Sequence, residues 1–179
     1  DCAPTSGFTL TDAAAAAKRC VEKLKGEGAE IILCLSHSGT AEAPAASEDE
    51  ELAKAVDGID VIISGHTHTT LTEPLVVNNT YIVSCGPYCQ NLGSLTFTWD
   101  GSGRKQLADY RLLPIDETVA EDPEIAGMVD QWKAMVGETY LKRYGMTYDQ
   151  VLTHTDYGLK TPDSGIQENN ALGNLVSDA

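Results

Sequence analysis

Basic residues are scarce in this sequence. Only 12 of its 179 residues are lysine or arginine, against 27 aspartates and glutamates, which gives a net charge of −15 at pH 7. No cluster of positive side chains is available to neutralise the phosphates of a nucleic acid or the head groups of an anionic membrane. The composition therefore predicts no nucleic-acid partner, and we interpret the acidic residues as a solvated surface.

Long hydrophobic runs are also missing. No stretch approaches the roughly 18 apolar residues that cross a bilayer, so the sequence predicts no membrane span. The first residues include neither an initiator methionine nor the basic and apolar regions of a signal peptide, so we expect the chain to be a piece of a longer protein. The proportions of hydrophobic residues (42%) and charged residues (22%) are typical of a folded, globular chain.

The cysteines lack the spacing of a zinc ribbon. The five cysteines lack paired CxxC spacing. A disulfide between Cys85 and Cys89, a disulfide between Cys2 and Cys20, and ordinary buried thiols remain alternatives.

The first half of the chain alternates helices with apolar strands. An amphipathic helix is expected over residues 11–26, and a short helix after the capping-box pattern of residues 47–50. The apolar run of residues 30–35 is typical of a strand buried on both faces, and residues 60–64 repeat this pattern. Each strand ends in a polar loop that contains histidine.

The histidines after these strands are His37, His66 and His68. In open α/β sheets the loops beyond the carboxyl ends of the strands carry ligand sites, so both loops are expected to face one pocket. Two histidines one residue apart, with Gly65 allowing close approach of the backbone, can direct their imidazoles at one metal ion or at two adjacent ions. A surface pair is an equally good interpretation of the GHxH string alone, and His37 at a second strand end favours the metal site.

The second half changes to hairpins and then to helix. Strands are expected over residues 75–77, 80–84, 94–99 and 106–113, with turns at residues 78–79 and 100–103. A helix is expected from Asp122 to about Tyr144, and residues 168–179 indicate the start of another.

Other chemically interesting side chains are interpreted as structural. Three carboxylates are interpreted as helix-start charges that favour the N-terminal dipole: Asp49, Glu50 and Glu51. Trp99 and Trp132 are expected to be core or sheet-packing residues, and His154 to be a surface residue. The serines at positions 36 and 38 lie beside a histidine but lack the glycine-flanked elbow of a serine nucleophile.

Four motifs, in order along the chain, carry a resemblance to a known family. Leu35-Ser36-His37-Ser38-Gly39 and residues 58–68 (GIDVIISGHTH) resemble the 5'-nucleotidase branch of the calcineurin-like metallophosphoesterases. Residues 84–95 (SCGPYCQNLGSL) are similar to that family's glycine-tyrosine strand pair. Residues 171–179 (ALGNLVSDA) are similar to the segment that opens its C-terminal nucleotide-recognition domain. Together these motifs cover nearly the whole chain.

The resemblance implies an α/β fold in three parts. Residues 1–114 would form the C-terminal half of a four-layer α/β-β/α metallophosphoesterase domain, and residues 115–145 a helical linker. Residues 146–179 would begin the C-terminal, substrate-recognition domain. The resemblance also implies an extracellular, periplasmic or cell-surface location.

By the same resemblance, His37 and His66 hold one divalent metal ion and His68 holds its neighbour. Two cations about 3.5–4 Å apart bind the phosphoryl oxygens, lower the pKa of a bound water and stabilise the departing oxygen. Imidazole suits Zn, Mn, Fe or Co, so the ligands do not name the metal. No catalytic residue is assigned within the chain, and the residues that bind the nucleotide substrate are expected further along the C-terminal domain.

The family's aspartate-x-histidine pair, bridging aspartate and asparagine-histidine pair are expected to precede Asp1. We therefore predict that the longer protein hydrolyses phosphate monoesters of nucleotides and that the isolated chain is inactive or nearly so. The open strand edges of a half-sheet predict self-association of the chain. The alternatives are a cyclic-nucleotide phosphodiesterase or UDP-sugar hydrolase, a relative from thiosulfate metabolism, and a non-catalytic binding or surface module.

Overall fold

The computed structural model describes residues 7, 9, 11–41, 47–102, 104–159 and 171–178. The chain divides into two compact units: unit 1 runs from Asp1 to Ala120 and unit 2 from Glu121 to Ala179. The three-part division at residues 114 and 145 stays a prediction.

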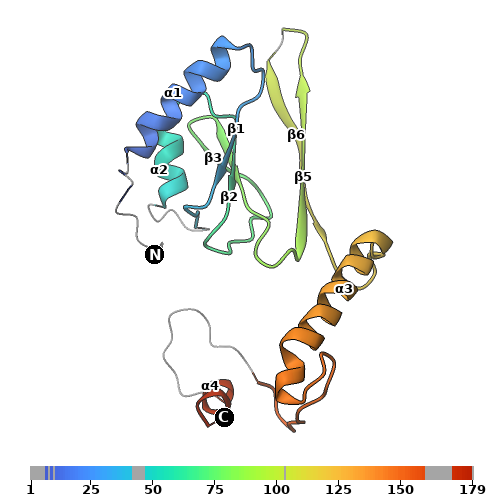
Figure 1. Ribbon diagram of the computed structural model, residues 1–179. Coiled ribbons are helices and arrows are strands. Elements are labelled where there is room, and N and C mark those ends of the chain that lie inside the picture. Colours follow the sequence, from blue (N-terminus) through green and yellow to red (C-terminus); the bar gives the residue numbers. More distant parts are fainter. Residues whose placement is uncertain are drawn as a thin grey trace. The chain divides into compact units, whose positions relative to one another are not determined.

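Unit 1 is built on a four-stranded, largely parallel sheet (Figure 1). The strands are β1 (Leu33–Ser36), β2 (Val61–Ser64), β3 (Leu75–Val77) and β4 (Thr80–Val83). Their order is β1-β2-β4-β3, with β1, β2 and β4 parallel and β3 antiparallel to β4. The predicted α/β class and the four predicted strands are therefore confirmed.

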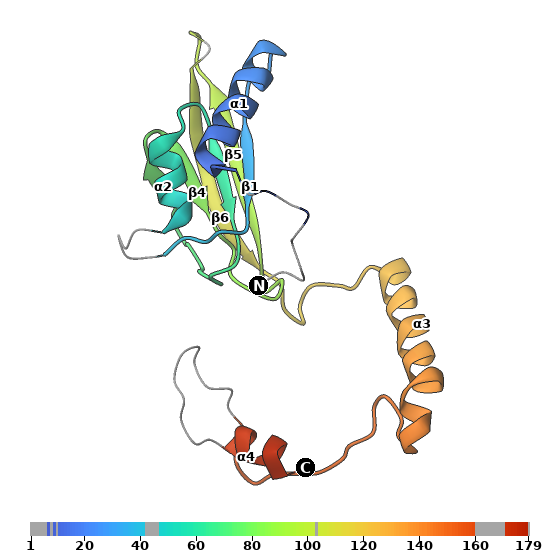
Figure 2. The same ribbon diagram turned by 60° about the vertical axis from the view of Figure 1, so that its left-hand side comes forward.

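Two helices cover one face of this sheet, as Figures 1 and 2 show. They are α1 (Ala13–Gly26) and α2 (Glu48–Ala55), close to the predicted bounds. α1 begins where the Asp12 carboxylate accepts a hydrogen bond from the backbone of Ala15 at 2.6 Å, which satisfies one free donor of the first turn.

The core lies between the helices and the sheet. The β2 residue Ile62 is fully buried, and it pairs in register with Cys34 of β1 and Ile82 of β4. Val21 of α1 and Ala53 of α2 pack against this row in the same cluster. Burial of this continuous apolar surface is the main stabilising contribution to unit 1.

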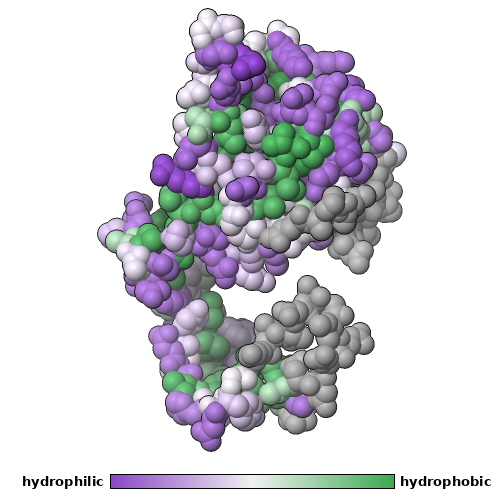
Figure 3. Space-filling model, turned by 180° about the vertical axis from the view of Figure 1, so that it is seen from behind, coloured by the Kyte–Doolittle hydropathy of each residue, from purple (hydrophilic) through white to green (hydrophobic). Residues whose placement is uncertain are grey.

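The second face of the sheet is only partly covered, which corrects the expectation that the first strand is buried on both faces. Leu33 is 55% exposed and Leu35 is 80% exposed. These side chains alternate with inward-facing ones because successive residues of a strand point to opposite faces. Viewed from behind Figure 1, hydrophobic residues reach the surface of unit 1 in patches between hydrophilic ones (Figure 3).

A long hairpin covers part of this second face. It consists of β5 (Asn91–Trp99) and β6 (Lys105–Pro114), which pair antiparallel. Phe97 of β5 packs edge-on against Tyr81 of β4, with the ring centroids 5.9 Å apart. Lys105 of β6 forms an ion pair with Asp60, just before β2. The predicted strands at 94–99 and 106–113 are confirmed and are slightly longer than expected.

Unit 2 contains α3 (Pro123–Thr139), the 3₁₀ helix η1 (Leu141–Tyr144) and α4 (Ala171–Asp178). α3 begins at the predicted Asp122-Pro123 start, where the Asp122 carboxylate accepts hydrogen bonds from the backbone N–H groups of Glu124 and Ile125. It ends at Thr139, five residues before the predicted end, because the chain tightens into η1.

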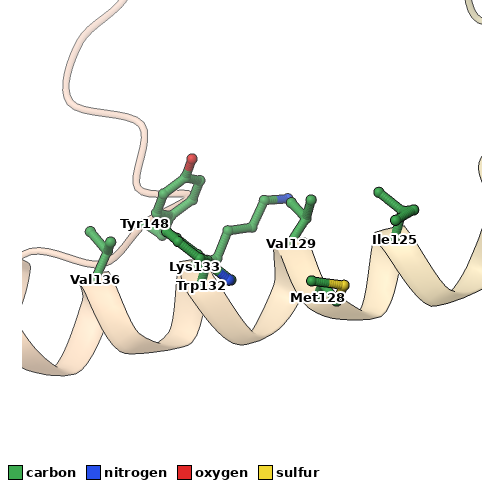
Figure 4. Close-up of a pocket in the computed structure, with 7 residues that line it drawn as sticks. All are labelled: Ile125, Met128, Val129, Trp132, Lys133, Val136 and Tyr148. Carbon is green, nitrogen blue, oxygen red and sulfur yellow. The ribbon is translucent and has the colours of Figure 1, made fainter.

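One side of α3 carries an apolar groove (Figure 4). Seven side chains line it: Ile125, Met128, Val129, Trp132, Lys133, Val136 and Tyr148. No residue of α3 is buried, and Trp132 is 65% exposed. The prediction that Trp132 is a core or sheet-packing residue is therefore wrong within the part of the chain that the structure describes. Trp99, at 48% exposure, likewise lies outside the core.

The structure also settles two smaller points. None of the helices formed by the described residues has the length and apolar character to cross a membrane. Cys20, Cys34, Cys85 and Cys89 are free thiols, which excludes the Cys85–Cys89 disulfide, and Cys2 lies outside the described residues.

The packing of the sheet predicts unequal effects of two neighbouring truncations. Ile62→Ala removes a fully buried side chain, so we expect the free energy of unfolding to fall by about 2–5 kcal/mol. Leu35→Ala removes an exposed side chain and is expected to change it by about 0.5 kcal/mol or less. Urea unfolding followed by circular dichroism measures both, and equal losses would contradict this account of the core.

Tyr110 of β6 predicts a loss of stability at alkaline pH. Its hydroxyl donates to the Leu71 carbonyl at 2.8 Å, and burial, reinforced by Cys85, raises the pKa of Tyr110 to about 12. A tyrosine in the unfolded chain ionises near pH 10. The stabilisation of the folded state by protonated Tyr110 is therefore complete below pH 10 and is lost as the pH rises through about 12. We expect Tyr110→Phe to make the urea midpoint less sensitive to pH between 10 and 12. The exposed Tyr157→Phe serves as control, and an unchanged profile for Tyr110→Phe would refute the assignment.

Candidate metal centre

The two predicted histidine loops leave the same edge of the sheet. His37 follows β1, and His66 and His68 follow β2. The last residues of these parallel strands, Ser36 and Ser64, pair in register. Because parallel strands in register end at one level, the loops beyond them start side by side.

His37 and His66 meet directly. Their ring centroids lie 5.2 Å apart, with the ring planes at 70°. Gly65 makes this approach possible, because a Cβ atom at that position would lie 2.9 Å from Nδ1 of His37. The glycine of the GHTH string is therefore required by the neighbouring imidazole.

Hydrogen bonds tie the two loops to each other. The Gly65 backbone N–H donates to the Ser36 carbonyl at 3.0 Å. The hydroxyls of Thr67 and Thr69 both donate to the Thr40 carbonyl, at 2.7 and 2.8 Å. The threonines that flank His68 thus anchor its loop to the loop of His37.

His66 and His68 both have left-handed backbone conformations, with φ of 74° and 58°. Residues with a Cβ atom adopt this region at a cost of about 1–3 kcal/mol, and such residues cluster at functional sites. The His68 ring packs edge-on against Tyr88 at a centroid distance of 5.2 Å. Tyr88 is itself left-handed, with φ of 59°, and its side chain is largely exposed.

The donor chemistry of the loops fits a metal ion in part. Exposed imidazoles from two adjacent loops are suitable ligands for a divalent transition metal. Within the described residues, however, no group of three histidine, cysteine, aspartate or glutamate side chains is placed to hold an ion. His37 and His66 thus fit as two ligands of one cation, whereas the His68 ring packs against Tyr88.

Sequence reasoning missed the roles of the carboxylates at the start of α2. Asp49 is fully buried and accepts hydrogen bonds from the hydroxyls of Ser36 and Ser64. Glu50 is 7% exposed and accepts one from the buried Thr40 hydroxyl at 2.9 Å. Both therefore face the histidine loops, and of the three residues interpreted as helix-start charges only Glu51 is exposed.

The predicted capping box is wrong for the same reason. The Ser47 side chain makes no capping hydrogen bond, and its hydroxyl is buried without a partner. Glu50, which would have completed the box, reaches Thr40 instead. The only sequence signal for this was an unusually dense run of acidic residues before an apolar helix.

The remaining candidates do not extend the site. Burial, reinforced by the charge of Asp49, raises the pKa of Cys34, so its thiol stays protonated and is a poor metal ligand. The hydroxyl of Ser36 donates to the buried Asp49 carboxylate, which also accepts from Ser64, so this serine joins the two strand ends. His154 is exposed, as expected. The groove on α3 is lined by no histidine, cysteine or carboxylate.

Comparison with known proteins relates these loops to phosphoesterases. No family model matches the chain. It is 32% identical to the trifunctional nucleotide phosphoesterase protein YfkN of Bacillus subtilis over 181 residues. The aligned region covers 98% of this chain and 12% of YfkN. It is 25% identical to the snake venom 5'-nucleotidase of Naja atra over 176 residues, and this aligned region covers 88% of this chain and 31% of the nucleotidase.

Solved structures give the same relationship. The sulfate thiohydrolase SoxB of Thermus thermophilus is similar with a TM-score of 0.60 and 28% identity, over 75% of this chain and 23% of SoxB. The chain spans less than a third of each of these three relatives. Nearly all of the chain aligns with the nucleotide phosphoesterase, and its fold is similar to the solved structures of YfkN and of a 5'-nucleotidase precursor from Thermus thermophilus. The chain belongs to the 5'-nucleotidase family of the calcineurin-like metallophosphoesterases.

Proposed function

We propose that this chain supplies the histidine ligands of a two-metal phosphoesterase centre. His37 and His66 hold one divalent cation, and His68 contributes to a second. The observation that carries the proposal is the 5.2 Å contact between the rings of His37 and His66, which come from two parallel strand ends. Zn, Mn, Fe and Co all accept imidazole ligands, so the chemistry leaves the metal open.

When bound, such a pair of cations holds the phosphoryl oxygens and lowers the pKa of a water molecule. The residues of this chain hold and orient the imidazoles for that role. The hydrogen bonds from Thr67 and Thr69 to Thr40 fix the loop of His68. The strained backbone at His66 and His68 sets the directions in which their rings leave the chain.

The substrates we propose are phosphate monoesters of nucleotides. This rests on the relatives, which are named as a nucleotide phosphoesterase and a 5'-nucleotidase. In the same proposal, residues 1–114 form the C-terminal half of a four-layer α/β-β/α domain, and residues 115–145, which include α3, form a helical linker. The segment from residue 146 onwards begins the nucleotide-recognition domain.

We further propose that the chain by itself hydrolyses little or no nucleotide. The three histidines are not accompanied by the carboxylate that bridges the metals of a two-metal site. The described residues also provide no group of three ligands for one ion. The location we propose is extracellular, periplasmic or at the cell surface. Relatives named as a snake venom 5'-nucleotidase of Naja atra and an apyrase of Anopheles gambiae support this location by analogy.

A second candidate function is hydrolysis of a sulfur-containing ester, as in a relative from thiosulfate metabolism. The similarity to SoxB, with 28% identity, favours it. Comparing hydrolysis of AMP with hydrolysis of a thiosulfate ester by the longer protein distinguishes the two functions.

Self-association of the isolated chain is part of the proposal. Leu33, Leu35 and Ile63 all present exposed apolar side chains on the sheet face that the hairpin leaves open. β1 is also an edge strand with unpaired backbone groups. A second copy of the chain is the partner that offers the same surface.

The metal site predicts how cobalt binding depends on each histidine. Titration of the 179-residue chain with Co²⁺, followed by visible absorption, gives the affinity. We expect His37→Ala and His66→Ala each to weaken binding by at least about tenfold, because losing a direct ligand costs no less than losing an outer hydrogen bond. His68→Ala is expected to have a smaller effect on this first cation.

His154→Ala is the matched control, since His154 is an exposed histidine on a polar segment of unit 2. It is expected to leave Co²⁺ affinity unchanged. The proposed function is wrong if His37→Ala and His66→Ala bind Co²⁺ as tightly as the unmodified chain.

A further inference from the structure

Two adjacent carboxylates are buried at the start of α2. Asp49 has no exposed surface, and Glu50 is 7% exposed. Glu51, the next residue, is exposed and pairs with Lys54. A buried carboxylate is costly unless hydrogen bonds replace its lost water, so the partners of Asp49 and Glu50 explain why they are tolerated.

Asp49 joins the ends of two strands with one side chain. The Ser36 hydroxyl donates to Oδ1 of Asp49, and the Ser64 hydroxyl donates to Oδ2, each at 2.5 Å. Ser36 and Ser64 are register partners at the ends of β1 and β2. Ser36 directly precedes His37, and Ser64 lies two residues before His66.

The same turn of helix also contacts the loops beyond the strands. The backbone N–H of Asp49 donates to the Gly39 carbonyl at 3.2 Å. Glu50 accepts from the Thr40 hydroxyl, and the Thr40 carbonyl in turn accepts from Thr67 and Thr69. Every loop that carries a site histidine is therefore connected, through at most two hydrogen bonds, to the first turn of α2.

We propose that Asp49 is a positioning residue that sets the separation of the His37 and His66 imidazoles. Its two oxygens span the strand ends, so the distance between the loops is fixed by the width of one carboxylate. An aspartate suits this position because a carboxylate accepts from both hydroxyls at once, whereas an amide offers only one acceptor oxygen. The proposed effect of Asp49 on the separation of the two rings is argued from the hydrogen bonds alone. Its effect on metal affinity rests on the proposed function.

The test uses Asp49→Asn in the 179-residue chain, with Glu51→Gln as the matched control on the same helix turn. Asparagine keeps the shape of the side chain but leaves one serine hydroxyl without an acceptor. The metal-free readout is the nuclear Overhauser effect between ring protons of His37 and His66 in histidine-labelled protein. The second readout is Co²⁺ affinity, measured where both variants are fully folded.

In Asp49→Asn we expect the cross-peak between the two rings to weaken or vanish and Co²⁺ affinity to fall by about tenfold, the lower end of the range for outer-shell partners of metal ligands. Glu51→Gln is expected to match the unmodified chain in both. If Asp49→Asn only lowers the melting temperature and keeps both the cross-peak and the affinity, Asp49 is a structural residue and the inference is overturned.

A further variant keeps the test decisive if Asp49→Asn does not fold. Ser64→Ala removes one of the two hydroxyl donors and leaves the carboxylate in place, so we expect a smaller change in the same direction for both readouts. An unchanged cross-peak in Ser64→Ala would also overturn the inference. If the unmodified chain binds no Co²⁺ while the cross-peak still depends on Asp49, the positioning role stands and the proposed metal function fails.

Discussion

The hydrogen bonds from Ser36 and Ser64 to one buried carboxylate are the constraint on which the histidine site depends. Parallel pairing of β1 and β2 brings the two strand ends to the same level, and one further backbone hydrogen bond, from the Gly65 N–H to the Ser36 carbonyl, follows the last paired residues. Beyond that point Asp49 and the threonine contacts to Thr40 hold the loops together. The helical layer therefore stabilises the core through its apolar side and shapes the site through its first turn.

Much of the fold followed from local patterns in the sequence. Apolar runs, turn residues and helix-start signals act over a few neighbouring positions, so the strands, the Asn78-Asn79 turn and the start of α3 were all predictable. Both central residues of that turn have positive φ, as a tight hairpin requires. The adjacency of His37 and His66 was also predictable, because it follows from parallel topology and not from any single contact.

What failed depended on contacts between distant segments. An apolar run shows that a strand is buried on one face but not whether a second layer covers the other, so the exposure of Leu35 was missed. The charges at the start of α2 matched a surface pattern. Asp49 and Glu50 nevertheless turn inward, because serine and threonine hydroxyls 10 to 15 residues away donate hydrogen bonds to their carboxylates. The position of Tyr88 beside His68 likewise depends on a left-handed turn that the sequence did not signal.

The exposed face of the sheet and the net negative charge of the chain have opposite effects on the proposed self-association. In the proposed self-association, apolar contact through Leu33 and Leu35 attracts two copies at short range, while a net charge of −15 repels them at longer range. Salt shortens that repulsion to about 8 Å at physiological ionic strength without weakening the attraction. The proposed self-association is therefore expected to strengthen as the ionic strength of the surroundings rises.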